Sequence, residues 1–381
     1  MLLERKNWVR AFHRVRQSLR GGMAAEALLD GLLEFYYLPA PPAAPGPCIR
    51  ILYVAMRDDY GNPRRGLSYE ENNFWHALVH SGYQMIRFDY MRICKRYGRA
   101  QMNRMLLETA YRWNPDVMFT VLFNDELDPT VIDRISRELP TVTVNWFCDD
   151  HWRFDNFSLK WAPYFNWVIT TAASAVERYV KAGITRVIYS QWACNHFLYR
   201  NLGLPKQYDV TFVGQPHGNR RGVIDALRQA GIDVRVWGYG WGTGRVTQAE
   251  MIRIFNQRKI NLNLSNAAWG DVAQIKGRDF EVPGCGGFLL TAYSDELERY
   301  YLPGVEVETY RSLPEMIEKI RYYLAHDDER ERIANLGYQR TLRDHTYQHR
   351  FATIFQKMEV IGSAEAAHPA HSAILSSSGR R

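Results

Sequence analysis

Short apolar runs alternate with longer amphipathic segments along most of the chain. The run IRILYVAM at 49–56 predicts a buried strand, SYEENNFWHALVHSGY at 68–83 predicts a helix that ends at a glycine, and QMIRFDY at 84–90 predicts a second strand. A strand, a crossover helix and another strand are the repeating unit of a parallel sheet. The chain after residue 48 therefore predicts an α/β domain.

The same alternation fills two successive regions. Further strands are expected at 116–123, 141–147, 167–171 and 186–192, with helices at 100–113, 129–138, 158–163 and 173–182. The second region has expected strands at 208–215, 233–240, 260–265 and 286–293, and helices at 219–230, 247–257, 313–325 and 328–343. We predict two αβα domains, at 48–200 and 201–345, followed by an amphipathic helix at 346–362.

Both ends of the chain differ from this body. Residues 1–24 place apolar side chains at helical spacing among arginines, which predicts a basic amphipathic helix that either packs on the body or contacts anionic lipid. A proline-rich linker completes residues 1–47. The small polar residues of the tail at 363–381 predict disorder.

Charge and cysteine content narrow the class of protein. The net charge is +7, but residues 1–20 carry six basic residues against one acid, so about two positive charges remain for the body. A nearly neutral body argues against a nucleic-acid-binding face. The five cysteines are scattered without a Cys-x-x-Cys spacing, which is typical of a reduced, cytoplasmic protein. We expect neither a membrane span nor a signal peptide, and the alternative location is the inner face of the cytoplasmic membrane.

Three stretches resemble a known family. KGRDFEVPGCGGFLLTAY at 276–293 opens a segment that continues to HTYQHR at 345–350, and this segment resembles the C-terminal signature of the spore-maturation CgeB-like glycosyltransferases. DVTFVGQPHGNRRGVIDAL at 209–227 and RRGLSYEENNFWHALVHSGYQMIRFD at 64–89 are similar to two other landmarks of that family. The resemblance implies a GT-B fold, in which two Rossmann-like αβα domains face a central cleft and a C-terminal helix crosses back to the first domain.

The resemblance also implies a donor site in the second domain. Glu281 matches the acid that binds the ribose of a nucleotide sugar, although an acid here is also compatible with a helix cap. Arg220, Lys276 and Arg278 are candidates for the pyrophosphate, against the alternative that they are solvated surface cations. The remaining donor candidates are glycines that allow close approach and an aromatic ring that either stacks on the ligand or belongs to the core: Gly214, Gly286, Gly287 and Tyr239.

One position departs from the pattern of the related retaining enzymes. A second acid, which contacts the transferred sugar, usually stands eight residues before the ribose acid, and this chain has Ala273 there. Asp271 is near but out of register. The resemblance therefore leaves sugar recognition and the stereochemical outcome open.

The loop after the strand at 141–147 is rich in acids. Asp149 and Asp150 are the candidates for catalysis, as a base for the acceptor hydroxyl or as a contact to the donor sugar. His151 and Asp155 follow them, so a helix cap and a site for Mg²⁺ or Mn²⁺ are the alternatives. GT-B transferases generally need no metal, and we expect none.

The loop after the first strand is the expected entry for the acceptor. Tyr60, Gly61, Ser68 and Glu70 are its candidate residues, and ordinary turn chemistry, with Ser68 as a helix cap, is the alternative. The predicted activity is metal-independent transfer of a sugar from a UDP-, GDP- or dTDP-sugar to a hydroxyl of a glycan, a lipid-linked glycan or a protein. The alternatives are a sugar-nucleotide epimerase, a hydrolase, and a silent nucleotide-sugar-binding scaffold.

Overall fold

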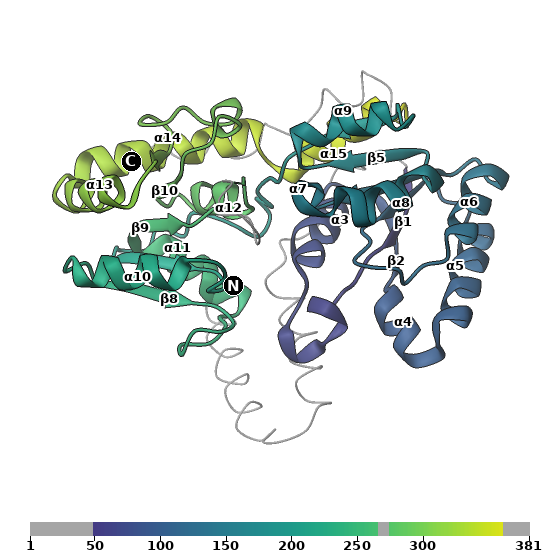
Figure 1. The fold of residues 1–381 in the computed structure, drawn as a ribbon, viewed down its shortest axis with the longest axis horizontal. Coiled ribbons are helices and arrows are strands. Elements are labelled where there is room, and N and C mark those ends of the chain that lie inside the picture. Colours follow the sequence, from purple (N-terminus) through teal and green to yellow (C-terminus); the bar gives the residue numbers. More distant parts are fainter. Residues whose placement is uncertain (1–48, 266–273, 361–381) are drawn as a thin grey trace, which may run out of the picture. The chain divides into compact units, whose positions relative to one another are not determined.

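The computed structural model describes residues 49–265 and 274–360, and these residues contain two parallel sheets (Figure 1). The predictions on residues 1–47, on Ala273 and on the tail at 363–381 lie outside the described residues. The first sheet has the order β2-β1-β3-β4-β5-β6. Its strands are β1 (Arg50–Val54), β2 (Gln84–Phe88), β3 (Val117–Thr120), β4 (Val142–Phe147), β5 (Trp167–Thr170) and β6 (Val187–Tyr189).

Helices connect the strands of this first lobe. They are α3 (His76–His80) with a preceding π-helical turn, α4 (Tyr90–Tyr97), α5 (Arg99–Trp113), α6 (Pro129–Glu138), α7 (Asp150–Arg153), α8 (Leu159–Trp161) and α9 (Ala173–Lys181). Side chains at their amino ends satisfy free backbone amides: Asp128, for example, accepts from the amide of Thr130 at the start of α6.

The second lobe is built in the same way. Its sheet has the order β11-β10-β9-β7-β8, with β7 (Tyr208–Val213), β8 (Val234–Trp237), β9 (Arg258–Asn263), β10 (Leu289–Ala292) and β11 (Glu308–Tyr310). Its helices are α10 (Arg220–Gln229), α11 (Gln248–Gln257), α12 (Arg278–Gly284), α13 (Leu313–Ala325) and α14 (Asp327–Asp344). Because every paired strand is parallel, the carboxyl ends of the strands in each sheet lie at one edge.

The last helix returns to the first lobe, as the sequence predicts. Helix α15 (Tyr347–Lys357), in yellow, lies among the helices of the first lobe, and its Phe351 and Phe355 belong to the same buried cluster as Phe74 (Figure 1). The chain therefore crosses between the lobes twice. The two crossings are paired, because the amide of Cys194 donates to the carbonyl of His345 at 2.9 Å and the amide of Tyr347 donates to the carbonyl of Cys194 at 3.0 Å.

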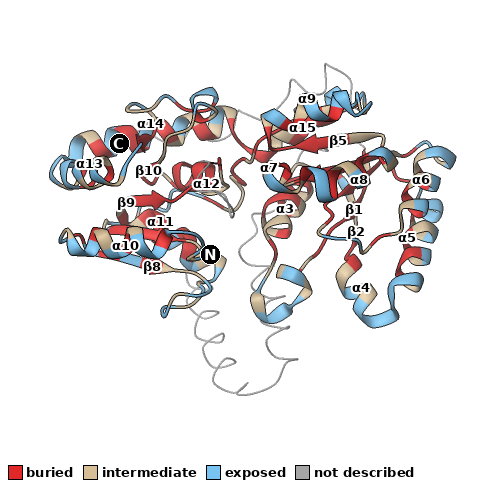
Figure 2. Cartoon of the chain, viewed as in Figure 1, coloured by how far each residue is buried: buried red, intermediate tan, exposed pale blue. Residues whose placement is uncertain are grey.

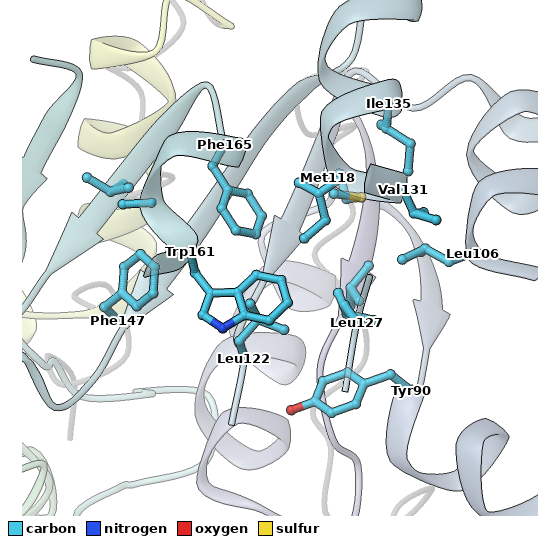
Figure 3. Close-up of a cluster of buried hydrophobic side chains, with 14 of the residues drawn as sticks. Tyr90, Leu106, Met118, Leu122, Leu127, Val131, Ile135, Phe147, Trp161 and Phe165 are labelled. Atoms are coloured by element: carbon cyan, nitrogen blue, oxygen red, sulfur yellow. The ribbon is translucent and has the colours of Figure 1, made fainter. Parts of the chain in front are cut away.

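Buried side chains follow the strands of both sheets (Figure 2). In the first lobe one cluster fills the space between the sheet and α5, α6 and α8, where Trp161 lies close to Phe165 and Leu122 (Figure 3). The indole of Trp161 donates to Asp125 at 3.0 Å, which satisfies the polar atom of an otherwise buried ring. No helix within the described ranges is long and apolar enough to cross a membrane.

Two helices differ from the sequence prediction. Helix α4 was not among the expected helices, although Tyr90, Ile93, Cys94 and Tyr97 recur at helical spacing; Asp89 caps it and Gly98 ends it with a φ of 80°. Helix α12 was not among the expected helices either, and it precedes the expected strand at 286–293. It is helical through Pro283 and Gly284, and its first backbone bond joins the amide of Glu281 to the carbonyl of Gly277 at 2.9 Å.

Gly337 lets α14 pack closely against the turn before β11. A Cβ atom at this position would lie 2.2 Å from the carbonyl oxygen of Glu306, which is backbone and cannot move aside. We expect Gly337→Ala to destabilise the protein by about 1–3 kcal/mol in urea unfolding. Gly242→Ala, where no atom lies within 4 Å, is the matched control and should change stability by less than about 0.5 kcal/mol. Equal stability of the two variants would contradict this packing.

Candidate active site

A cavity of about 340 Å³ lies at the carboxyl ends of β7 and β9. Both lobes line it, because Tyr69, Asp149 and Trp192 come from the first part of the chain and the other residues from the second. These others are Phe212, Val213, Gly214, Gln215, His217, Arg220, Asn263, Gln274, Lys276, Gly277 and Arg278. Three of the sequence-predicted donor cations are therefore brought together, although they come from two separate loops.

Arg220 opens α10 and is held rigidly. Its guanidinium donates to the carbonyl of Gln215 at 2.9 Å and to that of Leu264 at 2.5 Å. Burial lowers the pKa of Arg220 to about 10, so the side chain remains cationic at neutral pH. No carboxylate neutralises this cation among the described residues, and its contacts are carbonyl dipoles.

Lys276 lies on the cavity wall just before α12. Its ammonium donates to Gln274 at 2.7 Å, and its backbone amide donates to the carboxylate of Asp279 at 2.8 Å. Burial lowers the pKa of Lys276 to about 8, with Asp149 opposing the shift and Arg220 adding to it. The ammonium is thus charged at neutral pH but loses its proton more easily than an ordinary lysine.

Arg278 lines the cavity, and an acid outside the cavity compensates its charge. It forms an ion pair with Glu281, which has no exposed surface and also accepts a hydrogen bond from the hydroxyl of Tyr199 at 2.7 Å. Glu281 does not line the cavity. The structure therefore assigns its two oxygens to Arg278 and Tyr199, whereas the resemblance had implied that they face a ribose.

Of the glycine and aromatic residues predicted to bind the donor, the structure places one at the cavity and the others away from it. Gly214 lines the cavity, as expected. Gly286 and Gly287 do not; a Cβ on Gly286 would meet the side chain of Asn201 at 2.6 Å, and one on Gly287 would meet that of Asn261 at 2.8 Å. These two glycines serve internal packing. Tyr239 is 61% exposed and lies outside the cavity.

A second cavity of about 60 Å³ lies in the first lobe. It is lined by Met56, Glu70, Val121, Leu122, Phe123, Phe147, Cys148, Asp149, Arg153, Phe157 and Ser158. Asp149 is the residue that the two cavities share. It precedes α7 but its carboxylate makes no hydrogen bond that caps the helix. The geometry of Asp149 therefore does not support the alternative that this residue caps α7.

The other polar residues of that loop point to separate partners. Asp150 is buried and accepts from the hydroxyl of Tyr179 at 2.9 Å; it lines neither cavity, so its predicted catalytic role is not supported. His151 is hydrogen-bonded through Nδ1 to Gln274 at 2.9 Å, and Asp155 pairs with Arg178. Among the described residues, no group of three or more His, Cys, Asp or Glu is placed to hold a metal ion.

Of the residues predicted to bind the acceptor, the structure places one at a cavity and the others elsewhere. Glu70 lines the smaller cavity. Ser68 is buried and acts as a cap, because its hydroxyl donates to Met56 at 2.8 Å and accepts from the amide of Glu71 at 3.0 Å. Tyr60 and Gly61 lie outside both cavities, in a turn where Tyr60 has a φ of 52°.

Sequence reasoning missed several residues of the larger cavity. Tyr69 and Trp192 look like core aromatics in the sequence, and no local pattern brings them to the second lobe. Tyr69 nevertheless lies against Gly277, where a Cβ would be 2.5 Å from its hydroxyl. Asn263 carried a usable signal, since it is a polar residue at the carboxyl end of a buried strand.

The sequence comparisons point to one group of proteins. Residues 220–356 match the sequence model of a family described as "Glycosyl transferase-like". The chain is also 22% identical over 229 residues to the spore protein CgeB of Bacillus subtilis (strain 168), which covers 53% of this chain and 70% of that protein. The predicted resemblance to CgeB-like glycosyltransferases is confirmed.

Solved structures share the fold at low sequence identity. Sucrose-phosphate synthase from Thermosynechococcus elongatus superposes with a TM-score of 0.57 and 9% identity, over 82% of this chain and 99% of that one. HepE from Anabaena in complex with UDP-glucose gives a TM-score of 0.55 and 12% identity, over 82% and 100%. A glycosyltransferase from Rickettsia africae ESF-5 gives 0.54 and 9%, over 82% and 99%. The predicted GT-B fold is confirmed.

His217, which lines the larger cavity, and His151, which is bonded to Gln274 of its lining, predict a pH dependence of stability. Burial, assisted by Lys276, lowers the pKa of His151 to about 4, and burial with Arg220 and Lys276 does the same for His217. The unfolded chain, with a pKa of about 6.5, binds more protons than the folded chain between these values. We expect stability to be fully present above pH 6.5 and to fall as the pH drops toward 4, measured by urea unfolding.

The double variant His151→Gln, His217→Gln is the control for this dependence. It should retain part of the slope, because burial also lowers the pKa of His76 and of His345 to about 4. An unchanged slope in the double variant would show that His151 and His217 do not contribute.

Proposed function

We propose that this protein is a glycosyltransferase that binds a nucleoside diphosphate sugar in the larger cavity and an acceptor hydroxyl at the smaller one. The observation that carries the proposal is Asp149, a carboxylate that lines both cavities and shares the larger one with the cations Arg220, Lys276 and Arg278. This arrangement brings a proton acceptor and a site for a phosphate leaving group to one place.

The charges of the larger cavity suit a sugar nucleotide. Glu281 compensates Arg278, so Arg220 and Lys276 are the two cations without a carboxylate partner in the described residues. The diphosphate of a sugar nucleotide carries two negative charges, and these balance the two cations. Arg220 is buried and Lys276 is half-buried, and hydrogen bonds fix both, so little reorganisation is needed when the ligand binds.

The proposed reaction exchanges one bond at the anomeric carbon for another. The bond from this carbon to the diphosphate oxygen breaks, the acceptor oxygen forms the new bond, and Asp149 takes the acceptor proton. The departing diphosphate gains negative charge, which Arg220 and Lys276 stabilise more strongly than they stabilise the intact donor. Because these cations supply the charge that a divalent ion would otherwise supply, we propose that transfer needs no metal.

Lys276 gives the first test, with UDP as the probe because a structure of this fold contains UDP-glucose. We expect UDP to bind by calorimetry and Lys276→Ala to weaken binding about 10–100-fold, through loss of a charge-assisted contact of about 1.5–3 kcal/mol. Lys259→Ala, which removes a lysine paired with Asp209 outside the cavity, should bind normally. Failure of UDP, GDP and dTDP to bind at millimolar concentration would contradict the donor site.

The same lysine sets the expected pH dependence. Below pH 8 its ammonium is charged and binding is full; as the pH rises past about 8 the free protein loses this charge and affinity falls. Lys276→Arg should keep its affinity through pH 9 because a guanidinium remains protonated there. A wild-type affinity that does not change between pH 7 and 9 would contradict the assignment.

Asp149 gives the second test. We expect Asp149→Asn to lower release of the nucleoside diphosphate from its sugar donor by about 100-fold or more, since an amide cannot accept the proton, while UDP binds at least as tightly. Asp155→Asn, in the same loop but paired with Arg178, is the control. Turnover of Asp149→Asn at the wild-type rate would exclude Asp149 as the base.

Assays with and without acceptor separate the alternatives. Release that requires an acceptor supports transfer, turnover of the donor alone indicates a hydrolase or an epimerase, and tight binding without any turnover indicates a scaffold.

A further inference from the structure

One surface of the first lobe carries an excess of exposed positive charge. We name it the basic ridge; Figure 2 shows exposed residues over much of α4, which forms its centre. Between residues 57 and 107 every exposed charged residue is a cation, and the next exposed charged residue is Glu108, four residues after Arg104 on α5. The members of the ridge are Arg64, Arg92, Lys95, Arg96, Arg99 and Arg104.

The acids of the same region are withdrawn from the surface. Asp58, Glu71 and Asp89 are buried, and Asp89 is occupied in capping α4 through the amide of Arg92 at 3.1 Å. Asp59 is engaged by Arg65 and Arg245. Arg99 interacts with the exposed Asp125, and Glu108 lies one turn from Arg104, so the uncompensated positive charge of the ridge is concentrated on α4.

Helix α4 differs in this from α6 and α9 of the same lobe. Helices α6 and α9 carry cations paired with acids four residues away, such as Arg134 with Glu138. On α4, Arg92, Lys95 and Arg96 stand at i, i+3 and i+4, and none of them forms an ion pair within the described residues. Like charges at this spacing destabilise a helix, and a bound anion would relieve the repulsion.

Contacts connect the ridge to the smaller cavity. Phe123 lines that cavity. The ring of Tyr60 packs edge-on against the ring of Phe123, and the two ring centroids are 5.0 Å apart. The guanidinium of Arg65 lies 4.5 Å from the centre of the Tyr60 ring. Gly61 then packs on Met91 of α4, where a Cβ would lie 3.0 Å from the sulfur. Aromatic rings and cations thus continue from the cavity to α4.

We propose that the basic ridge binds an anionic acceptor glycan, a polymer with carboxylate or phosphodiester groups, and directs one of its hydroxyl groups into the smaller cavity. This inference rests on the proposed function. Tyrosine rings such as Tyr60 and Tyr97, which are 49% and 50% exposed, suit stacking on sugars. A membrane-inserting face needs exposed aliphatic side chains or tryptophan, and the described large exposed apolar residues on this surface are these tyrosines.

The test compares two variants with the same change in net charge. The ridge variant is R92E/K95E/R96E. The control variant is R253E/R332E/K357E, which changes exposed cations elsewhere that form no ion pair within the described residues. Binding is measured to polygalacturonate, poly(glycerol phosphate) and neutral dextran, at about 0.05 M and about 0.5 M salt.

We expect the wild type to bind at least one of the two anionic polymers but not dextran, with binding lost at the higher salt concentration. The ridge variant should bind about tenfold more weakly or worse, and the control variant within about twofold of the wild type. Equal losses in the two variants would indicate a general charge effect and overturn the proposal, as would wild-type binding by the ridge variant or no binding by the wild type.

Vesicles that contain phosphatidylglycerol distinguish the other anionic surface. Ridge-dependent binding to vesicles without binding to either polymer would overturn the proposal in favour of a membrane contact. UDP calorimetry on all three proteins separates this proposal from the proposed function, because the ridge lies outside the larger cavity and all three should bind UDP alike. Absence of UDP binding in the wild type would reject the donor site whatever the polymer result.

Discussion

The buried ion pair between Glu281 and Arg278 fixes the wall of the larger cavity. A carboxylate with no exposed surface is costly unless it is paired, and removal of one partner of such a pair typically costs about 3–5 kcal/mol. Arg278 and Tyr199 satisfy Glu281, so the first turn of α12 is bound to the segment that follows the first crossing between the lobes. Asp279, on the next face of the same turn, holds the amide of Lys276. One helical turn therefore orients two cavity cations through two buried acids.

Both ends of α12 also contact the region where the lobes meet. Gly277 lies against Tyr69, whose hydroxyl is 3.0 Å from that of Tyr347, and Gly284 lies against Cys194, where a Cβ would be 2.2 Å from the sulfur. Cys194 and Tyr347 belong to the two paired crossings. A larger residue at either glycine would press directly on this junction. The glycines of the signature segment thus serve contacts between parts of the protein.

Local periodicity was enough to predict the strands of both sheets except β11, because buried strands are encoded over a few residues, whereas the return of the last helix to the first lobe was implied by the family resemblance. The candidates Arg220, Lys276 and Arg278 were named from their loops and from the family resemblance, and the structure places all three at one cavity. The orientation of Glu281 was not predicted, because no helix was expected where α12 forms and the partner Tyr199 is 82 residues away. Asp149 and Asp150 are neighbours in sequence with equal chemistry, and only the packing of Tyr179 against Asp150 separates them.

The distribution of charge suggests how donor and acceptor are kept apart. The larger cavity has cations on the side of the second lobe, and the basic ridge has cations on the first lobe, so both surfaces attract anions. Asp149 lies between the two cavities and carries the opposite charge. In the proposed scheme it repels an anionic acceptor group that would otherwise occupy the diphosphate position, while it accepts a proton from a neutral hydroxyl. The same carboxylate would then serve both the chemistry and the separation of the two substrates.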